Sequence, residues 1–240
     1  MLSPNGIQAI LFDLDGTLRH NRPDGGEIFI AHARALGLSF SEDDRLRGIR
    51  WEHHYWANSI NLRADIEKYK EQEPDFWKNY SRRHLVALGI SPKQAVELGP
   101  ILSQYMNENY KPVSTLAAGA VGMLSQLKES GFRLGVVSNR ERPYEQEMDQ
   151  LGIRSLFEFS LAAGEVQSYK PHPGIFEAAL KWVETTPEAA MYVGDNYFAD
   201  VVGARRAGLR PVLYDPSGIY PDADCAVIAS FGGLSKLLKK

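Results

Sequence analysis

The chain has 240 residues, of which 44% are hydrophobic and 24% are charged. These proportions are ordinary for a globular protein and exclude a disordered or fibrous one. The formal net charge of −3 gives no general attraction to nucleic acid or to an anionic membrane. The single cysteine excludes both an internal disulfide framework and a metal site built from several cysteines.

The sequence predicts neither a targeting segment nor a membrane span. The stretch from Met1 to Phe12 has no basic region and only a short apolar run, which is less than a signal peptide needs. The longest uncharged stretch, residues 112–127, is too short and too polar to cross a bilayer. We therefore expect a cytoplasmic protein without a membrane partner.

Short apolar runs that end in turn residues predict strands buried on both faces. The first run, residues 7–12, ends at Asp13-Leu14-Asp15-Gly16. After residue 130 the same pattern recurs at residues 132–137, 189–193, 211–214 and 225–229.

Helical periods lie between these strands. One apolar helix face runs from Ala117 to Leu127 and ends before Gly131, a second follows Pro173, and a third leads to Gly208. Strands that alternate with helices predict βαβ units in one parallel sheet. The expected fold class is therefore α/β, a Rossmann-like parallel sheet with helices on both faces.

Residues 19–111 have a different pattern, with amphipathic stretches and no convincing strand. We interpret them as an all-helical domain inserted into an α/β core formed by residues 1–18 and 112–240. The aromatic residues around Trp51 are interpreted as packing. The apolar stripes on which this prediction rests are Ile28, Ala31, Ala35 and Leu38; Trp77, Tyr80, Leu85 and Leu88; and Ala95, Leu98, Leu102 and Tyr105.

Polar residues follow several predicted strands at their carboxyl ends, where open α/β sheets bind ligands. Asp13 and Asp15 follow the first strand, Ser138 and Asn139 the second, and Asp195 the third. In a parallel sheet these side chains converge at one edge. Carboxylates gathered in this way either share a proton or hold a hard divalent cation such as Mg²⁺.

Four motifs of the sequence resemble, in order, those of the haloacid dehalogenase superfamily. The resemblance covers the whole α/β part. The insertion at residues 19–111 also lies where that family places its helical, type 1 cap. The four motifs are Asp13-Leu14-Asp15-Gly16-Thr17-Leu18, Ser138-Asn139, Lys170-Pro171-His172-Pro173, and Gly194-Asp195 with Asp200.

The resemblance implies a role for each of these residues. Asp13 would be the nucleophile that forms an aspartyl-phosphate, and Asp15 the general acid and then the general base. Mg²⁺ would be held by carboxylate oxygens of Asp13 and Asp195 and by the backbone carbonyl of Asp15. The remaining roles are phosphate binding by Ser138 and Asn139, the latter through its backbone amide, charge neutralisation by Lys170, and support of the metal site by Asp200.

Dehalogenating members of the family lack a second aspartate at the position of Asp15, so the resemblance implies the phosphatase branch. We expect a Mg²⁺-dependent phosphatase whose cap closes over a small phosphorylated metabolite, with no nucleic-acid partner. A sugar phosphomutase with the same motifs and a non-catalytic phospho-ligand sensor or scaffold remain as alternatives. The sequence requires no particular oligomeric state.

Two arginines follow the first motif, where many related phosphatases carry acidic or small polar residues. Arg19 and Arg22 either receive a second anionic group of the substrate or lie exposed in the hinge to the cap.

Overall fold

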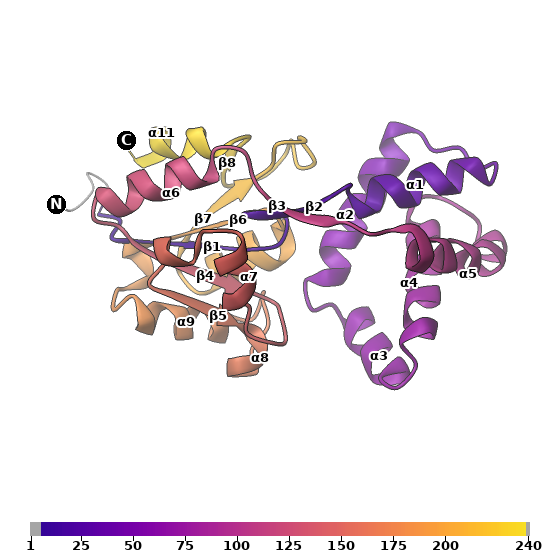
Figure 1. Cartoon of the computed structure of the whole chain (residues 1–240), viewed down its shortest axis with the longest axis horizontal. Coiled ribbons are helices and arrows are strands. Elements are labelled where there is room, and N and C mark those ends of the chain that lie inside the picture. Colours follow the sequence, from indigo (N-terminus) through magenta and orange to yellow (C-terminus); the bar gives the residue numbers. More distant parts are fainter. Residues whose placement is uncertain (1–5, 239–240) are drawn as a thin grey trace. The chain divides into compact units, whose positions relative to one another are not determined.

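The computed structural model describes residues 6–238, so Met1 to Asn5, part of the segment examined for a leader, lie outside it. The chain divides into two compact units (Figure 1). The α/β unit runs up to His20 and resumes at Ser114, and the helical unit comprises Asn21–Val113. The limits predicted for the insertion, 19 and 111, each precede those of the helical unit by two residues. Within residues 6–238, no helix combines the length and the apolar character needed to traverse a lipid bilayer.

Six parallel strands form the sheet of the α/β unit, in the order β5-β4-β1-β6-β7-β8. The central strand β1 pairs with β4 on one side and β6 on the other, so that Phe12 lies in register with both Val136 and Val193. The predicted Rossmann-like parallel sheet is confirmed. The strands are β1 (Ala9–Phe12), β4 (Arg133–Ser138), β5 (Phe159–Ala162), β6 (Ala190–Gly194), β7 (Arg210–Tyr214) and β8 (Ala226–Ile228).

Helices cover both faces of this sheet because alternate residues of each strand point to opposite sides. Ile10 and Phe12 belong to the core cluster that contains α6 and α11, whereas Leu11 belongs to the cluster that contains α9. Figure 1 shows α6 and α11 on one side of the sheet and α9 on the other. The helices of this unit are α6 (Ala120–Glu129), α7 (Glu145–Gln150), α8 (Ala163–Val166), α9 (Pro173–Trp182), α10 (Val202–Arg206) and α11 (Leu234–Leu238).

Three strands were not expected from the sequence. The edge strand β5 was not predicted, because its four residues include Ser160 and only pairing with β4 makes the run a strand. The expectation of no strand within residues 19–111 is wrong at β2 (Arg19–Arg22), which pairs with β3 (Val113–Leu116). Its sequence Arg-His-Asn-Arg has no apolar alternation, so hydrophobic periodicity gives no signal for this strand.

Four helices of the helical unit, all except the one that begins at Glu73, start at a residue whose side chain caps the first turn. The hydroxyl of Ser41 accepts from the backbone N–H of Asp44, whose carboxylate accepts from the backbone of Ser41 in return. The hydroxyl of Ser91 likewise accepts from the backbone N–H of Gln94 at the start of the last helix, with Pro92 at the first helical position. The helices are α1 (Gly25–Ala35), α2 (Glu42–Trp56), α3 (Ile60–Tyr69), α4 (Glu73–Ala87) and α5 (Pro92–Asn109).

The core of the helical unit corrects one predicted stripe. On α1 the buried residues are Phe29, Ile30 and Ala33, whereas Ala31 and Ala35 of the predicted stripe are exposed. Apolar residues occur on both sides of this short helix, and packing against α4 and α5 decides which side is buried.

The aromatic residues of α2 pack as interpreted. The ring of Trp51 stacks on Tyr55 and on His84, and lies 5.5 Å from the ring of Tyr80 between centroids.

Substitution of a buried residue on α6 should destabilise the α/β unit. Leu124 is fully buried and Val121, on the same helix, is 44% exposed. We expect Leu124→Ala to lower the free energy of unfolding by about 2–5 kcal/mol, because it removes buried methyl groups and leaves a cavity. The control Val121→Ala should change it by less than about 0.5 kcal/mol. Urea unfolding followed by circular dichroism measures both, and equal losses would contradict the assignment of the buried face.

Candidate active site

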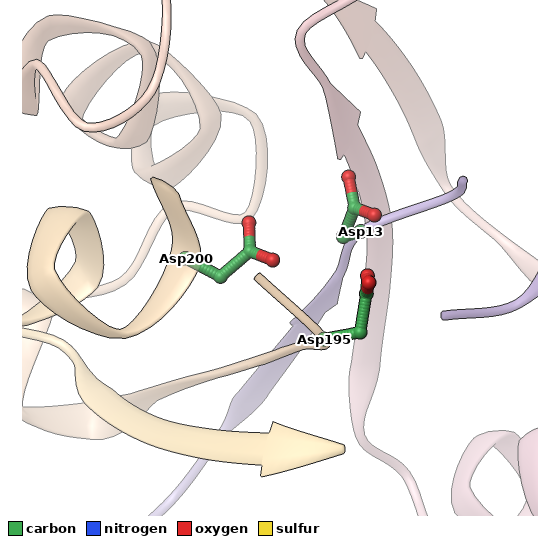
Figure 2. Close-up of side chains that lie close together, drawn as sticks. All are labelled: Asp13, Asp195 and Asp200. Carbon is green, nitrogen blue, oxygen red and sulfur yellow. The ribbon is translucent and has the colours of Figure 1, made fainter. Parts of the chain in front are cut away.

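The predicted site residues meet at the carboxyl edge of the sheet. Asp13 follows β1, and its backbone N–H donates to the carbonyl of Val193 in β6 at 2.9 Å. Asp195 follows β6. Because β1 and β6 are neighbouring parallel strands, both aspartates lie at the same edge of the sheet. Asp200 reaches this point from the helical turn after β6, and Figure 2 shows the three carboxyl groups lying close together.

Lys170 is the buried cation of this group. Its Nζ donates to Asp13 Oδ1 at 2.6 Å, to Asp200 Oδ1 at 2.7 Å and to the Tyr192 hydroxyl at 2.9 Å, which uses all three ammonium protons. The Tyr192 hydroxyl donates in turn to the carbonyl of Val137 at 2.8 Å. Tyr192 was not among the predicted site residues, because it lies within an apolar strand and carries no motif signal.

Thr17 holds Asp195 beside Asp13. Its hydroxyl accepts from the backbone N–H of Asp195 at 2.9 Å and donates to Asp195 Oδ1 at 2.9 Å, with Asp13 Oδ2 farther away at 3.4 Å. The close approach requires Gly16, because a Cβ there would lie 2.4 Å from Asp195 Oδ2 and because φ is +88°. The glycine of the first motif therefore makes room for a carboxylate.

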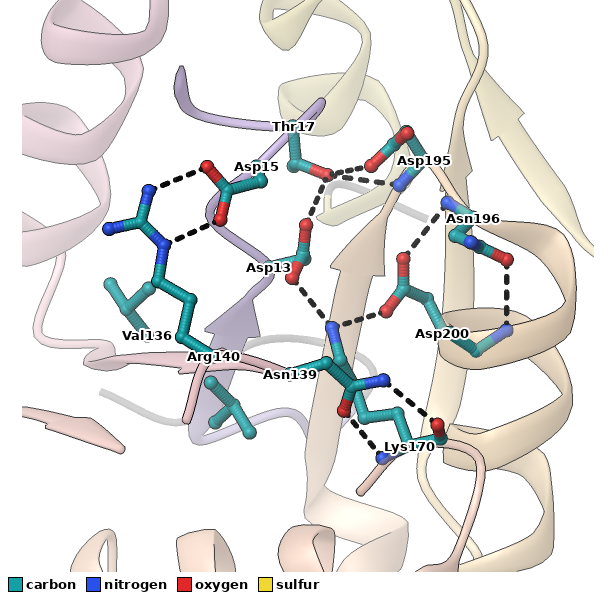
Figure 3. A network of polar contacts seen from close by, with 12 residues as sticks. Asp13, Asp15, Thr17, Val136, Asn139, Arg140, Lys170, Asp195, Asn196 and Asp200 are labelled. Carbon is teal, nitrogen blue, oxygen red and sulfur yellow. Dashed lines mark hydrogen bonds and ion pairs between the residues drawn. The ribbon is translucent and has the colours of Figure 1, made fainter. Parts of the chain in front are cut away.

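A π-helical turn over Tyr197–Val201 directs Asp200 back toward Lys170. The side chain of Asn196 accepts from the first backbone N–H groups of the turn, and its backbone N–H donates to Asp200 Oδ2 at 2.9 Å. Both carboxylate oxygens of Asp200 therefore have donors within the protein. Figure 3 shows Asp200 linked to Lys170 on one side and to Asn196 on the other.

The side chain of Asn139 joins two of the loops that carry the motifs. Its amide nitrogen donates to the carbonyl of Lys170 at 2.9 Å, and its Oδ1 accepts from the backbone N–H of Lys170 at 2.6 Å. This side chain therefore fixes the loop of the buried lysine, while phosphate binding by the backbone amide of Asn139 stays a prediction. Ser138 is buried at the end of β4.

Asp15 lies in a separate ion network within the same unit. Arg140 donates to both of its carboxylate oxygens, at 2.7 and 2.8 Å, and Arg19 donates to Oδ1 at 3.0 Å. Glu147 pairs with both arginines. Arg140 and Glu147 were not among the predicted site residues, although Arg140 directly follows the motif Ser138-Asn139.

Burial dominates the electrostatics of the carboxyl groups. It raises the pKa of Asp13 to about 7, helped by the charge of Asp200 and opposed by that of Lys170. It likewise raises the pKa of Asp195 to about 7, and the nearby charge of Asp13 adds to the effect. Burial alone would lower the pKa of Lys170, but the charges of Asp13 and Asp200 outweigh it and hold that pKa well above its ordinary value.

The donor set fits a small divalent cation. Ligand atoms of Asp13, Asp195 and Asp200 lie within 4.8 Å of one another. Carboxylate oxygens are the ligands that Mg²⁺ prefers, and a cation would stabilise the charged forms of Asp13 and Asp195, which burial disfavours. Asp200 already accepts from Lys170 and Asn196, so Asp13 and Asp195 are the better placed ligands.

A comparison with protein families matches residues 7–208 to the haloacid dehalogenase-like hydrolases. The chain belongs to this family. The resemblance inferred from the four motifs, and with it the prediction of a hydrolytic enzyme, is confirmed.

Curated relatives and solved structures agree with this assignment. The chain is 30% identical to the human haloacid dehalogenase-like hydrolase domain-containing protein 3, over 86% of this chain and 81% of the relative. It is 37% identical to the glyceraldehyde 3-phosphate phosphatase of Methanothermobacter thermautotrophicus, over 86% and 85%. A crystal structure of 2-haloacid dehalogenase from Pseudomonas syringae matches with a TM-score of 0.56 and 25% identity, over 97% of this chain and 98% of that one.

The raised pKa values predict that the metal-free protein loses stability as the pH rises. Asp13 and Asp195 have pKa values of about 7 in the folded chain, against an ordinary value of 3.8. Between about pH 4 and 7 the unfolded chain therefore releases protons that the folded chain retains. With EDTA present, Asp195→Asn should be more stable than the wild type at about pH 7.5, by a difference that shrinks toward about pH 4.

Urea unfolding at several pH values measures this difference, and Asp222→Asn, at an exposed carboxylate, is the matched control. A lower stability of Asp195→Asn at the higher pH would contradict the electrostatic account.

Proposed function

We propose that this hydrolase is a Mg²⁺-dependent phosphatase that acts on a small soluble phosphomonoester. The observation that carries the proposal is the buried pair of Asp13 and Lys170, with Asp195 and Asp200 beside it. A buried carboxylate next to a fixed ammonium group can attack phosphorus where the charge of the phosphoryl oxygens is neutralised. Relatives whose names are those of phosphatases, including the glyceraldehyde 3-phosphate phosphatase of Methanothermobacter thermautotrophicus, add support.

In the first step the ionised carboxylate of Asp13 attacks phosphorus. An O–P bond forms to Asp13 while the bond from phosphorus to the leaving-group oxygen breaks, and Asp15 gives that oxygen a proton. Lys170 keeps its proton, because its pKa is held well above the ordinary value, and it can neutralise the phosphoryl group as it bonds to Asp13.

In the second step water attacks the phosphorus of the aspartyl-phosphate. Asp15, now ionised, takes the proton of the water, and the bond between phosphorus and Asp13 breaks to release inorganic phosphate. The proton balance closes, since Asp15 receives one proton and gives one in each turnover.

Mg²⁺ would be held by the carboxylates of Asp13 and Asp195 and by the backbone carbonyl of Asp15. When bound, it supplies positive charge toward the phosphoryl oxygens and separates the two buried carboxylates. Asp200 would support the site through Lys170 and the backbone of Asn196.

Arg19 is not assigned to a second anionic group of the substrate. Its guanidinium donates to Asp15 and to the Ser114 hydroxyl and pairs with Glu147 at 2.9 Å, so its charge is already balanced within the protein. Arg22 is exposed at the end of β2.

Replacement of the nucleophile tests the proposed chemistry. Asp13→Asn should reduce release of phosphate from p-nitrophenyl phosphate by at least about 1,000-fold, because an amide cannot form the aspartyl-phosphate. Circular dichroism checks that the variant is folded, and Asp222→Asn is the control at an exposed carboxylate. Turnover of Asp13→Asn near that of the wild type would remove Asp13 from its role.

Removal and return of the metal tests the cofactor and separates the alternatives. Phosphatase activity should be lost in EDTA and restored by Mg²⁺, because the buried carboxylates of Asp13 and Asp195 repel each other without a cation. A panel of phosphorylated metabolites, with free phosphate and isomerised sugar phosphate measured side by side, identifies the preferred substrate. Isomerisation without phosphate release would indicate a phosphomutase, and the absence of any turnover would indicate a sensor.

A further inference from the structure

Two arginines hold the carboxylate of Asp15. Arg140 donates from Nε to Oδ2 at 2.7 Å and from Nη2 to Oδ1 at 2.8 Å, the parallel two-point contact that a planar guanidinium makes with a carboxylate. Arg19 donates to Oδ1 at 3.0 Å. Figure 3 shows the carboxylate of Asp15 turned toward Arg140 and away from Asp13.

Arg140 is itself fixed on several sides. Its Nη1 pairs with Glu147, and its guanidinium carbon lies 5.5 Å from the ring centroid of Tyr144. Tyr144 is buried, and its hydroxyl lies within hydrogen-bond distance of the carbonyls of Val136 and Leu161. The side chain of Arg140 is only 26% exposed. Such an arginine gives its partner a defined orientation, which a mobile surface side chain could not do.

The network closes on itself and balances its charge. Glu147 pairs with Arg19 at 2.9 Å and accepts from the Ser114 hydroxyl at 3.1 Å, while that hydroxyl also accepts from Arg19. Two guanidinium groups therefore face two carboxylates, those of Asp15 and Glu147. The balance leaves no excess positive charge for an anionic ligand, so the arrangement is better suited to orienting Asp15 than to binding substrate.

In-line phosphoryl transfer explains why Asp15 needs this orientation. The attacking and leaving oxygens lie on opposite sides of phosphorus, so a proton donor for the leaving group must stand apart from the nucleophile. Asp13 and Asp15 are only two residues apart, and Asp13 is held by Lys170 on the buried side of the loop. The contacts from Arg140 and Arg19 keep the second carboxylate at a distance from the first.

We propose that Arg140, fixed by Glu147, is a positioning residue that holds Asp15 on the side where the leaving group departs. The inference rests on the proposed function, in which Asp15 gives the leaving group its proton. It assigns to Arg140 an effect on the reaction that is exerted through Asp15 alone.

The test compares two substrates that differ in their need for a proton. The p-nitrophenolate leaving group departs without one, whereas the alkoxide of glycerol 2-phosphate needs one. Arg140→Met should lower kcat/KM for glycerol 2-phosphate by about 10–100-fold, which is a part of the rate enhancement that general acid catalysis supplies. For p-nitrophenyl phosphate the loss should be less than about threefold. Arg140→Lys should lose nearly as much, because an ammonium group cannot make the two-point contact.

Arg142→Met is the matched control, since Arg142 is exposed on the same loop, and it should behave like the wild type with both substrates. A double-mutant cycle adds a readout that a merely structural role would not give. In an Asp15→Asn background, Arg140→Met should change kcat/KM for glycerol 2-phosphate by less than about twofold, because the effect of Arg140 is exerted through the carboxylate that this background lacks.

Equal losses on both substrates, additive losses in the double mutant, or a gain of activity in Arg140→Met would overturn the inference. If Arg140→Met does not fold, Glu147→Gln should give a smaller loss with the same preference for the activated substrate, and a uniform loss there would also overturn it. A wild-type protein that releases no phosphate from either substrate with Mg²⁺ would refute the proposed function itself, whereas an active wild type with uniform losses refutes only the role of Arg140.

Discussion

The burial of Lys170 against Asp13 and Asp200 is the constraint on which the rest of the site depends. A charged ammonium group with 2% exposure is stable in a protein only when its protons all find acceptors, since an unpaired buried charge costs several kcal/mol. Two carboxylates and the Tyr192 hydroxyl supply those acceptors. Each acceptor comes from a different element, so these elements must be held in fixed positions relative to one another.

The surrounding hydrogen bonds fix these positions. The side chain of Asn139 connects the end of β4 to the backbone of Lys170 by two hydrogen bonds, and Asn196 holds the turn that delivers Asp200. Gly16 lets the first motif approach Asp195 more closely than any other residue would allow. Loops normally carry functional residues with some freedom, and these contacts remove much of it.

Two aspartates only two residues apart receive different environments, which suits them to different tasks. Asp13 is buried beside a lysine, whereas the side chain of Asp15 is 39% exposed and faces two arginines. Pairs of carboxyl groups whose surroundings differ in this way commonly divide nucleophilic and proton-transfer work between them. The chain is similar both to a protein named as a phosphatase and to a 2-haloacid dehalogenase, so the fold alone does not decide the chemistry.

The sequence by itself determined the parallel α/β sheet, because runs such as residues 7–12 are apolar enough to be buried on both faces. It also located the motifs of the candidate site, because polar residues follow the strands at fixed positions. It also indicated the helical insertion. The buried face of α1 was predicted wrongly because apolar residues occur on both sides of that helix, and the strands β2, β3 and β5 escaped prediction because their short sequences show no clear apolar alternation. Only the tertiary structure decided the partners of the motifs. Tyr192 looks like a core residue and Arg140 like a surface one until long-range packing sets the first beside Lys170 and the second beside Asp15, 22 and 125 residues away in the chain. Contacts over such separations depend on strand order and loop geometry, which no local pattern encodes.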